Sequence, residues 1–377
     1  MSALGPALGP ELLSAPDEGD DRPIASVSQS KLIWRRFVSH KMAVVGLVGL
    51  SGLYFVAIFA GFFAPTTADH YDTNYAYAPP QLPGISSEGI YVNGYTQTVD
   101  PQTLETKYVQ DPSQRIPLGF FVRGESYTVL GLFETNIHLF GPQQADEPFY
   151  LIGADEQGRD MLSRIIYAAR ISLSVGLVGV AFALVLGMII GGISGYFGGR
   201  IDALIQRFIE LLISVPTLPL WLGLSAAVPA YWSPVSVYLA ITVVLSFLGW
   251  TGVARVVRGQ FLQIRNEDFV LAAKLDGCSG RRIIFRHMLP LSASYIIASL
   301  TIAIPAMILA ETALSFLGLG LREPAVSWGV LLQNAQSLKV LSSAPWLLTP
   351  ALAVIAAVVC LSFVGDGLRD AADPYGK

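Results

Sequence analysis

The chain has 377 residues, of which 53% are hydrophobic and only 14% are charged, and its formal net charge is −4. Its mean hydropathy of +0.53 lies outside the range expected of a soluble domain, and its acidic balance gives no reason to expect nucleic-acid binding. The two cysteines, Cys278 and Cys360, fall in a predicted loop and a predicted membrane span, so no disulfide scaffold is implied.

The two ends of the chain are predicted to be tails. Residues 1–30 are polar, rich in Ala, Gly, Pro and Asp, and lack an apolar core, so we expect a disordered cytoplasmic tail. Residues 31–65 then carry a basic flank and the first long apolar segment. Residues 371–377 are expected to form a second short cytoplasmic tail.

Six segments have the roughly 20 apolar residues that a helix needs to cross a bilayer. They are residues 42–63, 171–195, 201–228, 234–257, 289–317 and 345–365. Pro216 in the third segment and Pro305 in the fifth predict kinks, which membrane helices tolerate when their neighbours satisfy the freed carbonyls. Gly187, Gly191 and Gly195 repeat every four residues in the second segment, which predicts the close approach of another helix.

Basic residues beside the spans predict the orientation. One group stands just before the first span, and a second group lies between the fourth and fifth spans. The first comprises Lys31, Arg35, Arg36 and Lys41, and the second is spread over residues 255–286. Because positive residues favour the cytoplasm, both termini and the 255–286 loop are predicted to lie inside.

Residues 66–150 are then an external insertion between the first two spans. They are rich in Tyr, Pro and Gly, and the stretches 89–99 and 126–133 predict short strands with turns. His70 and His138 are isolated in the sequence, and the insertion shows no metal-ligand cluster or nucleophile arrangement. A structural lid or a partner-docking module is expected here rather than an enzyme domain.

The most informative segment is the polar, basic interruption at residues 258–288, between two apolar spans. Phe269, Ala272 and Ala273 can share one face of a short helix. Gly277 would end that helix in a left-handed conformation. An ordinary basic loop against anionic headgroups is the alternative, but the Ala pair and the Gly turn favour a close protein contact.

A second short helix is expected after the glycine turn. Ser279 can cap it, and it would run through Arg281 to His287, including Arg286. Pro290 would then begin the next span, where a missing N–H costs nothing. Two short helices joined at a glycine form a knob that can seat in a groove on a partner.

This segment resembles the coupling loop of ABC-importer permeases, which has the pattern Glu-Ala-Ala, then Gly, then Leu-Pro. Here Ala272-Ala273, Gly277 and Leu289-Pro290 stand at the matching distances, whereas Leu271 replaces the Glu. The resemblance implies that ATPase subunits bind this loop. The residues that would carry this contact are Phe269, Ala272, Ala273, Asp276, Gly277, Ser279, Arg286, His287, Leu289 and Pro290.

Further motifs narrow the resemblance to the second permease subunit of dipeptide/oligopeptide-type ABC importers. GADEQGRDMLSR precedes the second span, ETALSFLGLG and PAVSWGVLL follow the coupling loop, and GDGLRDAADP closes the sixth span. The first of these is similar to the family signature, with Ala154 where Thr is usual. The resemblance covers residues 151–374, which contain the predicted core permease domain at 151–370, and the long insertion is the main departure.

The resemblance implies an all-α membrane protein with the six-helix fold of a type I ABC importer permease and a small external insertion of mixed or β character. It also implies a bacterial or archaeal inner-membrane location, a second homologous permease subunit, two ABC ATPase subunits and an external substrate-binding protein as partners. No G-x-x-x-x-G-K-[ST] sequence occurs, so ATP and magnesium are expected on the ATPase partners and not on this chain. Peptides are the implied substrate, while oligosaccharides or another small solute stay open.

Charged residues near the span ends are candidates for a gate or pathway. Glu210 lies three residues after Arg207 and can pair with it on one helical face, either as an interfacial anchor or as a residue of the gate or pathway. Pro216, later in the same span, is a second gate or pathway candidate. Glu311 is placed about 31 Å along the fifth span from Pro290, near the outer boundary. An external-gate role and a structural hydrogen bond are both open for Glu311.

The signature before the second span contains Asp155, Gly158, Arg159 and Asp160. An arginine flanked by carboxylates can fix this segment through charge-assisted hydrogen bonds. The segment would either brace the insertion or contact a substrate-binding protein.

Two other classes of protein compete with the importer. A gradient-driven secondary transporter would need ionisable residues near the bilayer midplane and two similar halves, and the sequence shows neither. A membrane-anchored receptor needs a single span and leaves the other five unexplained.

Overall fold

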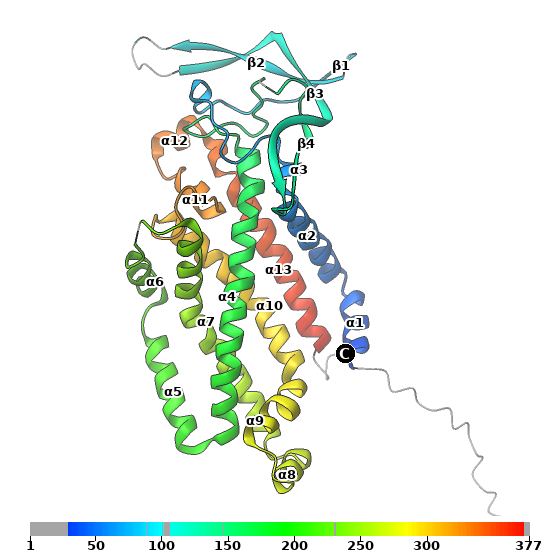
Figure 1. The fold of residues 1–377 in the computed structure, drawn as a ribbon, viewed down its shortest axis with the longest axis vertical. Coiled ribbons are helices and arrows are strands. Elements are labelled where there is room, and N and C mark those ends of the chain that lie inside the picture. Colours follow the sequence, from blue (N-terminus) through cyan, green and yellow to red (C-terminus); the bar gives the residue numbers. More distant parts are fainter. Residues whose placement is uncertain are drawn as a thin grey trace, which may run out of the picture.

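The computed structural model describes residues 29–372, apart from 88, 100, 102–105, 146 and 230. It is an elongated bundle of helices with a small antiparallel sheet at one end and two short helices, α8 (Asp268–Leu275) and α9 (Gly280–Arg282), at the other (Figure 1). The predicted fold class, a helical membrane protein with a small insertion of β character, is confirmed. The predicted tails fall outside the described residues, except for 29–30 and 371–372, which belong to helices.

Five helical segments in the described residues are long and apolar enough to cross a membrane. They are α2 (Lys41–Ile58), α4 (Met161–Phe197), α7 (Pro234–Ile264), the continuous segment Gly280–Phe316 and the segment Pro345–Ala372. The last two contain α10 (Leu289–Phe316) and α13 (Pro350–Ala372). The remaining short elements are α1 (Gln29–Ser39), α3 (Ala60–Phe63), η1 (Thr73–Tyr75), α11 (Trp328–Gln333), α12 (Leu338–Ser343) and η3 (Pro345–Leu348).

The third predicted span, 201–228, is broken rather than kinked. It consists of α5 (Gly199–Ser214) and α6 (Thr217–Ala226), which are bent by 82° relative to each other. Val215 has an extended backbone, with φ −82° and ψ 128°, as favoured for a residue before proline. Since Pro216 also lacks an N–H, the helix stops there and restarts at Thr217.

The fifth span begins earlier than the sequence predicted. A helix runs without interruption from Gly280 through the π-helical segment η2 (Ile283–Met288) into α10, so the expected separate helix ending near His287 is wrong. In η2 the N–H of Leu289 donates to the carbonyl of Ile284, five residues back. This wider turn accommodates Pro290, which lacks an N–H, inside the helix instead of at its start.

The glycine stripe of the second span lies against α7, as predicted. A Cβ at Gly187 would lie 2.5 Å from Cβ of Val253, and one at Gly191 would lie 2.4 Å from the carbonyl oxygen of Ala254. A Cβ at Gly195 would meet Phe261 at 2.6 Å. The backbones of α4 and α7 can therefore approach this closely only because these positions carry no side chain.

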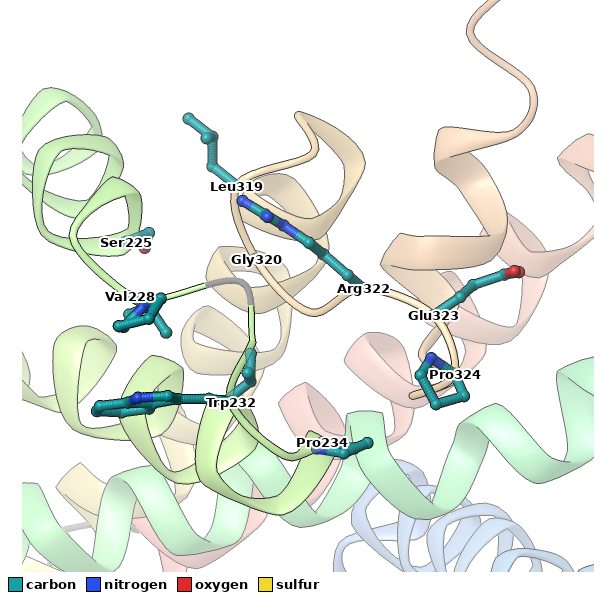
Figure 2. Close-up of a pocket in the computed structure, with 11 residues that line it drawn as sticks. Ser225, Val228, Trp232, Pro234, Leu319, Gly320, Arg322, Glu323 and Pro324 are labelled. Atoms are coloured by element: carbon teal, nitrogen blue, oxygen red, sulfur yellow. The ribbon is translucent and has the colours of Figure 1, made fainter.

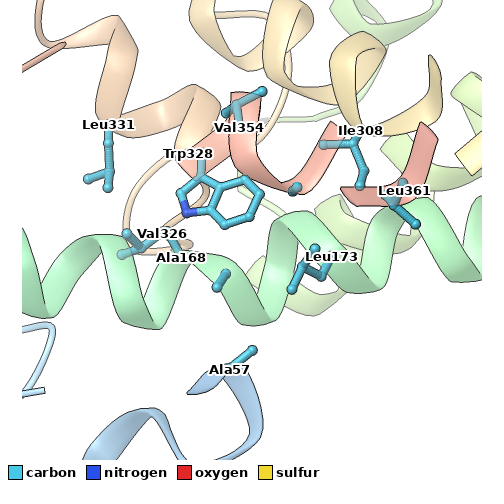
Figure 3. Close-up of a cluster of buried hydrophobic side chains, with 11 residues drawn as sticks. Ala57, Ala168, Leu173, Ile308, Val326, Trp328, Leu331, Val354 and Leu361 are labelled. Atoms are coloured by element: carbon cyan, nitrogen blue, oxygen red, sulfur yellow. The ribbon is translucent and has the colours of Figure 1, made fainter. Parts of the chain in front are cut away.

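One buried cluster of the bundle is organised around a tryptophan that follows the fifth span. Trp328, at the start of α11, is buried among apolar side chains from α2, α4, α10 and α13 (Figure 3). Its indole N–H donates to the carbonyl of Ile165 at 3.1 Å, and its backbone N–H donates to the Ser172 hydroxyl at 3.0 Å. The buried residues of this cluster are Ala57, Ala168, Ala169, Leu173, Ile308, Val326, Trp328, Leu331, Val354, Ala357 and Leu361.

The insertion folds into a four-stranded antiparallel sheet in the order β1-β2-β3-β4. The strands are β1 (Gly84–Ser86), β2 (Gly89–Val99), β3 (Thr106–Val129) and β4 (Phe133–Pro142). The first half of β3 pairs with β2 and its second half pairs with β4, with register shifts at Asn93/Gly94 and at Arg123/Tyr127. The predicted strand at 89–99 coincides with β2, and the predicted stretch at 126–133 covers the end of β3, the turn and the first residue of β4.

Candidate functional site

The sequence predicted a knob at residues 269–287, and the structure forms it from α8, a glycine turn and the start of the helix that continues into α10. Gly277 has φ +70°, the left-handed region that favours glycine. The N–H of Cys278 donates to the carbonyl of Ala273 at 3.0 Å, and the N–H of Gly277 donates to that of Lys274 at 3.1 Å. This pair of bonds is the Schellman arrangement that ends a helix, and Ser279 then caps α9 by accepting the N–H of Arg282.

The two faces of α8 differ from the prediction. Val270 and Ala273 are buried against Phe261 of α7 and against the η2 segment. Ala272 points the other way and is exposed with Leu271 and Leu275, the last being 89% exposed. Ala272 and Ala273 therefore do not share a face, because Val270 and Ala273 occupy the side that packs on the chain itself.

The remaining residues predicted for the coupling surface lie around this knob. Phe269, Asp276 and Arg286 are exposed, whereas His287 and Leu289 are half-buried. The Lys274 ammonium lies 5.4 Å from the centroid of the Tyr196 ring, at the end of α4. The structure thus leaves an apolar surface formed by Leu271, Ala272 and Leu275 facing away from the bundle.

An ion pair that sequence reasoning missed braces the same end of the bundle. Arg258 of α7 donates to both carboxylate oxygens of Asp202 of α5, at 2.5 and 2.7 Å. The Ser194 hydroxyl of α4 donates to the same carboxylate at 2.5 Å. These contacts tie α4, α5 and α7 together beside the knob. Positions 56 residues apart give no local sequence signal for such a pair.

The gate candidates in the third span lie on an exposed surface of this chain. Arg207 pairs with Glu210 at 2.9 Å, as the spacing predicted, and both side chains are exposed. Pro216 marks the break between α5 and α6. The structure does not bring these residues together with Glu311.

Glu311 organises the loop that follows α10. It is fully buried, and one carboxylate oxygen accepts the hydroxyls of Ser315 and Ser327, both at 2.7 Å. The oxygens of these hydroxyls accept the backbone N–H groups of Leu321 and Val330, at 3.0 and 3.3 Å. The geometry favours the structural alternative for Glu311, because each serine links the carboxylate to a backbone donor of the loop or of α11.

The signature before the second span forms a buried ionic network, which we call the clasp and define as Asp155, Arg159, Arg164 and Glu323. Arg159 donates to Asp155 at 2.7 Å and, through both terminal nitrogens, to Glu323 at 3.1 and 2.7 Å. Arg164 bonds to Asp155 and, at 2.6 Å, to Glu323. Asp155 and Arg164 are almost completely buried. The clasp joins the start of α4 to the loop between α10 and α11.

Electrostatics inside the clasp favours the charged forms of Arg159 and Glu323. Burial alone would lower the pKa of Arg159, but its bonds to Glu323 and Asp155 raise that pKa above the ordinary value. Burial likewise tends to raise the pKa of Glu323, whereas the bonds from Arg159 and Arg164 hold it below the usual range. Because each of these two groups has hydrogen-bonded partners of opposite charge, both can stay ionised although they are partly shielded from water.

The other two signature residues attach the clasp to the insertion. Gly158 has φ +72°, and a Cβ there would lie 1.8 Å from the backbone oxygen of Asp72. Asp160 accepts the N–H and the hydroxyl of Ser163, at 2.8 and 2.6 Å, and thereby caps α4. The Ser163 hydroxyl in turn accepts the N–H of Thr66 at 3.1 Å. Bracing of the insertion is the alternative that this geometry favours.

A cavity of about 110 Å³ opens beside the clasp, between the α6–α7 loop and the loop after α10 (Figure 2). Trp232 and Pro234 line one side, and Leu319, Arg322 and Glu323 line the other. The clasp thus reaches the edge of a hollow at the sheet end of the bundle.

Comparison with known proteins assigns the family. The model of the binding-protein-dependent transport system inner membrane component matches residues 183–375, which is more than half of the chain. The chain belongs to this family. The model of the N-terminal TM domain of oligopeptide transport permease C matches residues 28–80. The sheet lies between the two matched stretches.

Individual relatives agree with the family. The chain is 40% identical over 259 residues to the dipeptide transport system permease protein DppC of Bacillus subtilis, covering 68% of this chain and 76% of that protein. It is 38% identical over 245 residues to the oligopeptide transport system permease protein OppC of Haemophilus influenzae, covering 65% and 76%. The resemblance stated from the motifs is confirmed.

A solved structure, described as inward facing conformations of the MetNI methionine ABC transporter, is also similar to part of the chain. The TM-score is 0.43 with 16% sequence identity, over 56% of this chain and 97% of that one.

Proposed function

We propose that this family member is the membrane subunit of an ATP-driven peptide importer, which forms the pathway with a second, related permease. The observation that carries the proposal is the knob, an exposed apolar surface on α8 whose inner face is packed onto the membrane helices. Two ATPase subunits would bind this surface, and ATP with magnesium would be held and hydrolysed by them. An external binding protein would deliver the substrate at the sheet end.

The continuous helix from Gly280 to Phe316 supports a lever mechanism. Its 37 residues correspond to about 55 Å at 1.5 Å per residue, and it begins directly at the knob. Closure of the ATPase dimer would displace α8 and shift this helix as one body. The motion would change the access of the pathway from one side to the other, as in hinge-type transitions.

The basic flanks support placing the knob in the cytoplasm of a bacterial or archaeal cell and the sheet outside. Both termini would then be cytoplasmic. The names of DppC and OppC support peptides as the substrate class, whereas an oligosaccharide or another small solute is the second candidate. A gradient-driven transporter is disfavoured, because the sequence shows neither ionisable residues near the bilayer midplane nor two similar halves.

A matched pair of variants at Gly277 tests the lever. Nothing lies within 4 Å of a Cβ at this position, so a side chain meets no steric obstacle and only the left-handed backbone selects against it. Asn tolerates this conformation, whereas a β-branched residue does not. In proteoliposomes containing the complete complex and its binding protein, Gly277→Val should abolish ATP-dependent peptide uptake and Gly277→Asn should retain most of it.

The controls separate the parts of the proposal. Both variants should insert into the membrane as the wild type does. Less of the ATPase subunits should co-purify with Gly277→Val than with Gly277→Asn. Equal uptake by both variants would contradict the lever. Uptake of oligosaccharide but not of peptide would contradict the substrate class alone, and uptake driven by an ion gradient without ATPases would support the rival transporter.

A further inference from the structure

The β3–β4 hairpin has an apolar tip with an unusual turn. The tip residues Leu130, Leu132 and Phe133 are 62%, 74% and 71% exposed. Leu130 and Gly131 have φ of +52° and +71°, and the N–H of Leu132 donates to the carbonyl of Val129. This is a type I′ turn, in which Asn or Asp normally precedes the Gly in water. A leucine held in a left-handed conformation and exposed to solvent therefore requires an explanation.

The contacts of the hairpin show where its tip points. The Phe121 ring lies 6.1 Å from that of Phe62, and the Tyr127 ring covers Gly61 of α3. Both contacts place β3 against α3. The hairpin descends beside α3 toward the end of α2, and Figure 1 shows its closed end lying next to the top of that helix.

An arginine of α4 serves as a landmark for the position of the hairpin along α2. Thr128 and Glu134, which are paired across the hairpin, line a hollow together with Arg170. Arg170 donates to the carbonyls of Ala57 and Ile58, at 2.8 and 3.1 Å, in the last turn of α2. Since the 18 residues of α2 span about 27 Å, this turn lies at the edge of the hydrocarbon core. The tip lies about two residues further along the hairpin than Thr128 and Glu134, which is roughly 7 Å along the strand.

A chain of aromatic contacts joins the hairpin to the exposed face of α2. Phe55 of α2 contacts Phe63, Phe63 contacts Phe62, and Phe62 contacts Phe121, with centroid distances of 5.7, 5.4 and 6.1 Å. Phe55 is exposed on a helix of which only a small part is buried. The hairpin thus adjoins the exposed face of α2 through Phe121, and the polar residues Thr128 and Glu134 lie between Phe121 and the apolar tip along the hairpin.

We propose that the β3–β4 hairpin is a membrane anchor whose tip, Leu130 to Phe133, inserts into the bilayer leaflet at the sheet end. An insertion of about 5–10 Å into the boundary between headgroups and acyl chains is the depth at which amphipathic surface elements bind. The surrounding lipid stabilises an apolar turn that water does not favour. The anchor holds the sheet at a fixed height above the bundle, together with the clasp.

Depth-dependent quenching in proteoliposomes tests the proposal on the full complex. Cys278 and Cys360 are replaced by Ser, and single cysteines at Leu132, at Ile85 and at Val48 are labelled with an environment-sensitive fluorophore. Ile85 is an 88% exposed apolar residue of β1, outside the hairpin, and Val48 lies mid-way along α2. Lipids spin-labelled near the headgroup should quench the Leu132 label strongly, and aqueous iodide should quench it several-fold less than the Ile85 label.

The opposite pattern overturns the anchor. Quenching of the Leu132 label by iodide to the same extent as the Ile85 label, without quenching by spin-labelled lipid, would show that the tip lies in water. Protection from iodide only after the binding protein is added would assign the tip to a protein interface instead. Hydrogen exchange of residues 127–135 without any label provides an independent measurement, and it should be slower in nanodiscs than in detergent if the tip is in lipid.

Discussion

The two ends of the bundle hold their signature segments in opposite ways. At the knob, Val270 and Ala273 pack inward while Leu271 and Leu275 are left uncovered, and one glycine sets the turn. At the clasp, four charged side chains from distant segments bond to one another. An exposed apolar surface on a tight turn suits docking by a partner, whereas a buried ionic network suits a fixed connection. The contrast fits the proposed lever, in which motion would enter at the knob while the sheet end would resist it.

The largest effect is expected from breaking the clasp at Asp155. In Asp155→Asn one acceptor oxygen becomes an NH2 group, which then faces the donors of Arg159 and Arg164. Breaking one partner of a buried pair typically costs about 3–5 kcal/mol, because the remaining charge stays buried without compensation. Thermal unfolding in detergent, followed with a thiol-reactive dye at the free cysteines, should show a large decrease of the midpoint.

The matched control is the exposed pair at the other end. Glu210→Gln breaks the Arg207–Glu210 contact, and exposed pairs of this kind contribute about 0–1 kcal/mol. Its unfolding midpoint should stay near that of the wild type. Equal decreases for both variants would remove the contrast between a buried clasp and solvent-exposed pairs.

Two glycines with nearly the same backbone conformation allow the two ends to be compared directly, and their substitution should have an intermediate effect on stability. Gly158 and Gly277 have φ of +72° and +70°, and placing a Cβ residue in this region costs about 1–2 kcal/mol. Gly277→Ala should cost no more than this, since its surroundings are open. Gly158→Ala should cost more, because its Cβ would overlap the Asp72 backbone. Limited proteolysis of the 66–80 segment and of the knob would measure local unfolding beside Gly158 and beside Gly277 separately. Similar stability of both variants would contradict the expected difference between the two sites.

Local signals in the sequence were sufficient for the turn of the knob but not for the clasp. The Gly277 turn and the Ser279 cap follow from residues within one or two helical turns, and both are present. The orientation of Ala273 could have been found by including Val270, which lies on the same helical face. Glu323 is 164 residues from Arg159, so only the folded chain brings them together. Sequence reasoning named Arg159 and Asp155, and it missed Glu323 for this reason.

Two helix boundaries show how packing decides what prolines do. Pro216 breaks the third span by 82°, while Pro290 lies within a continuous helix. Both residues have the same covalent restriction. Before Pro290, however, Ile283, Ile284 and Met288 are buried in one cluster, which holds a π-helical turn wide enough for the ring. The sequence locates both prolines, but this tertiary contact is absent from any local pattern.

The smallest expected effect is a pH dependence of the clasp through Glu323. Bonds from Arg159 and Arg164 hold the pKa of this carboxyl below its usual range, so folding favours its ionised form. A group with a lowered folded pKa contributes its full stability above the unfolded value of about 4.5, and loses it as the pH falls through the folded value. Because Glu323 is 37% exposed, solvent screening limits the contribution to about 1 kcal/mol or less. Unfolding midpoints between pH 7 and pH 3 should therefore fall slightly less for Glu323→Gln than for the wild type, since the variant has already lost this carboxylate. An identical acid slope in both proteins would show that other carboxylates account for the whole pH dependence of the sheet end.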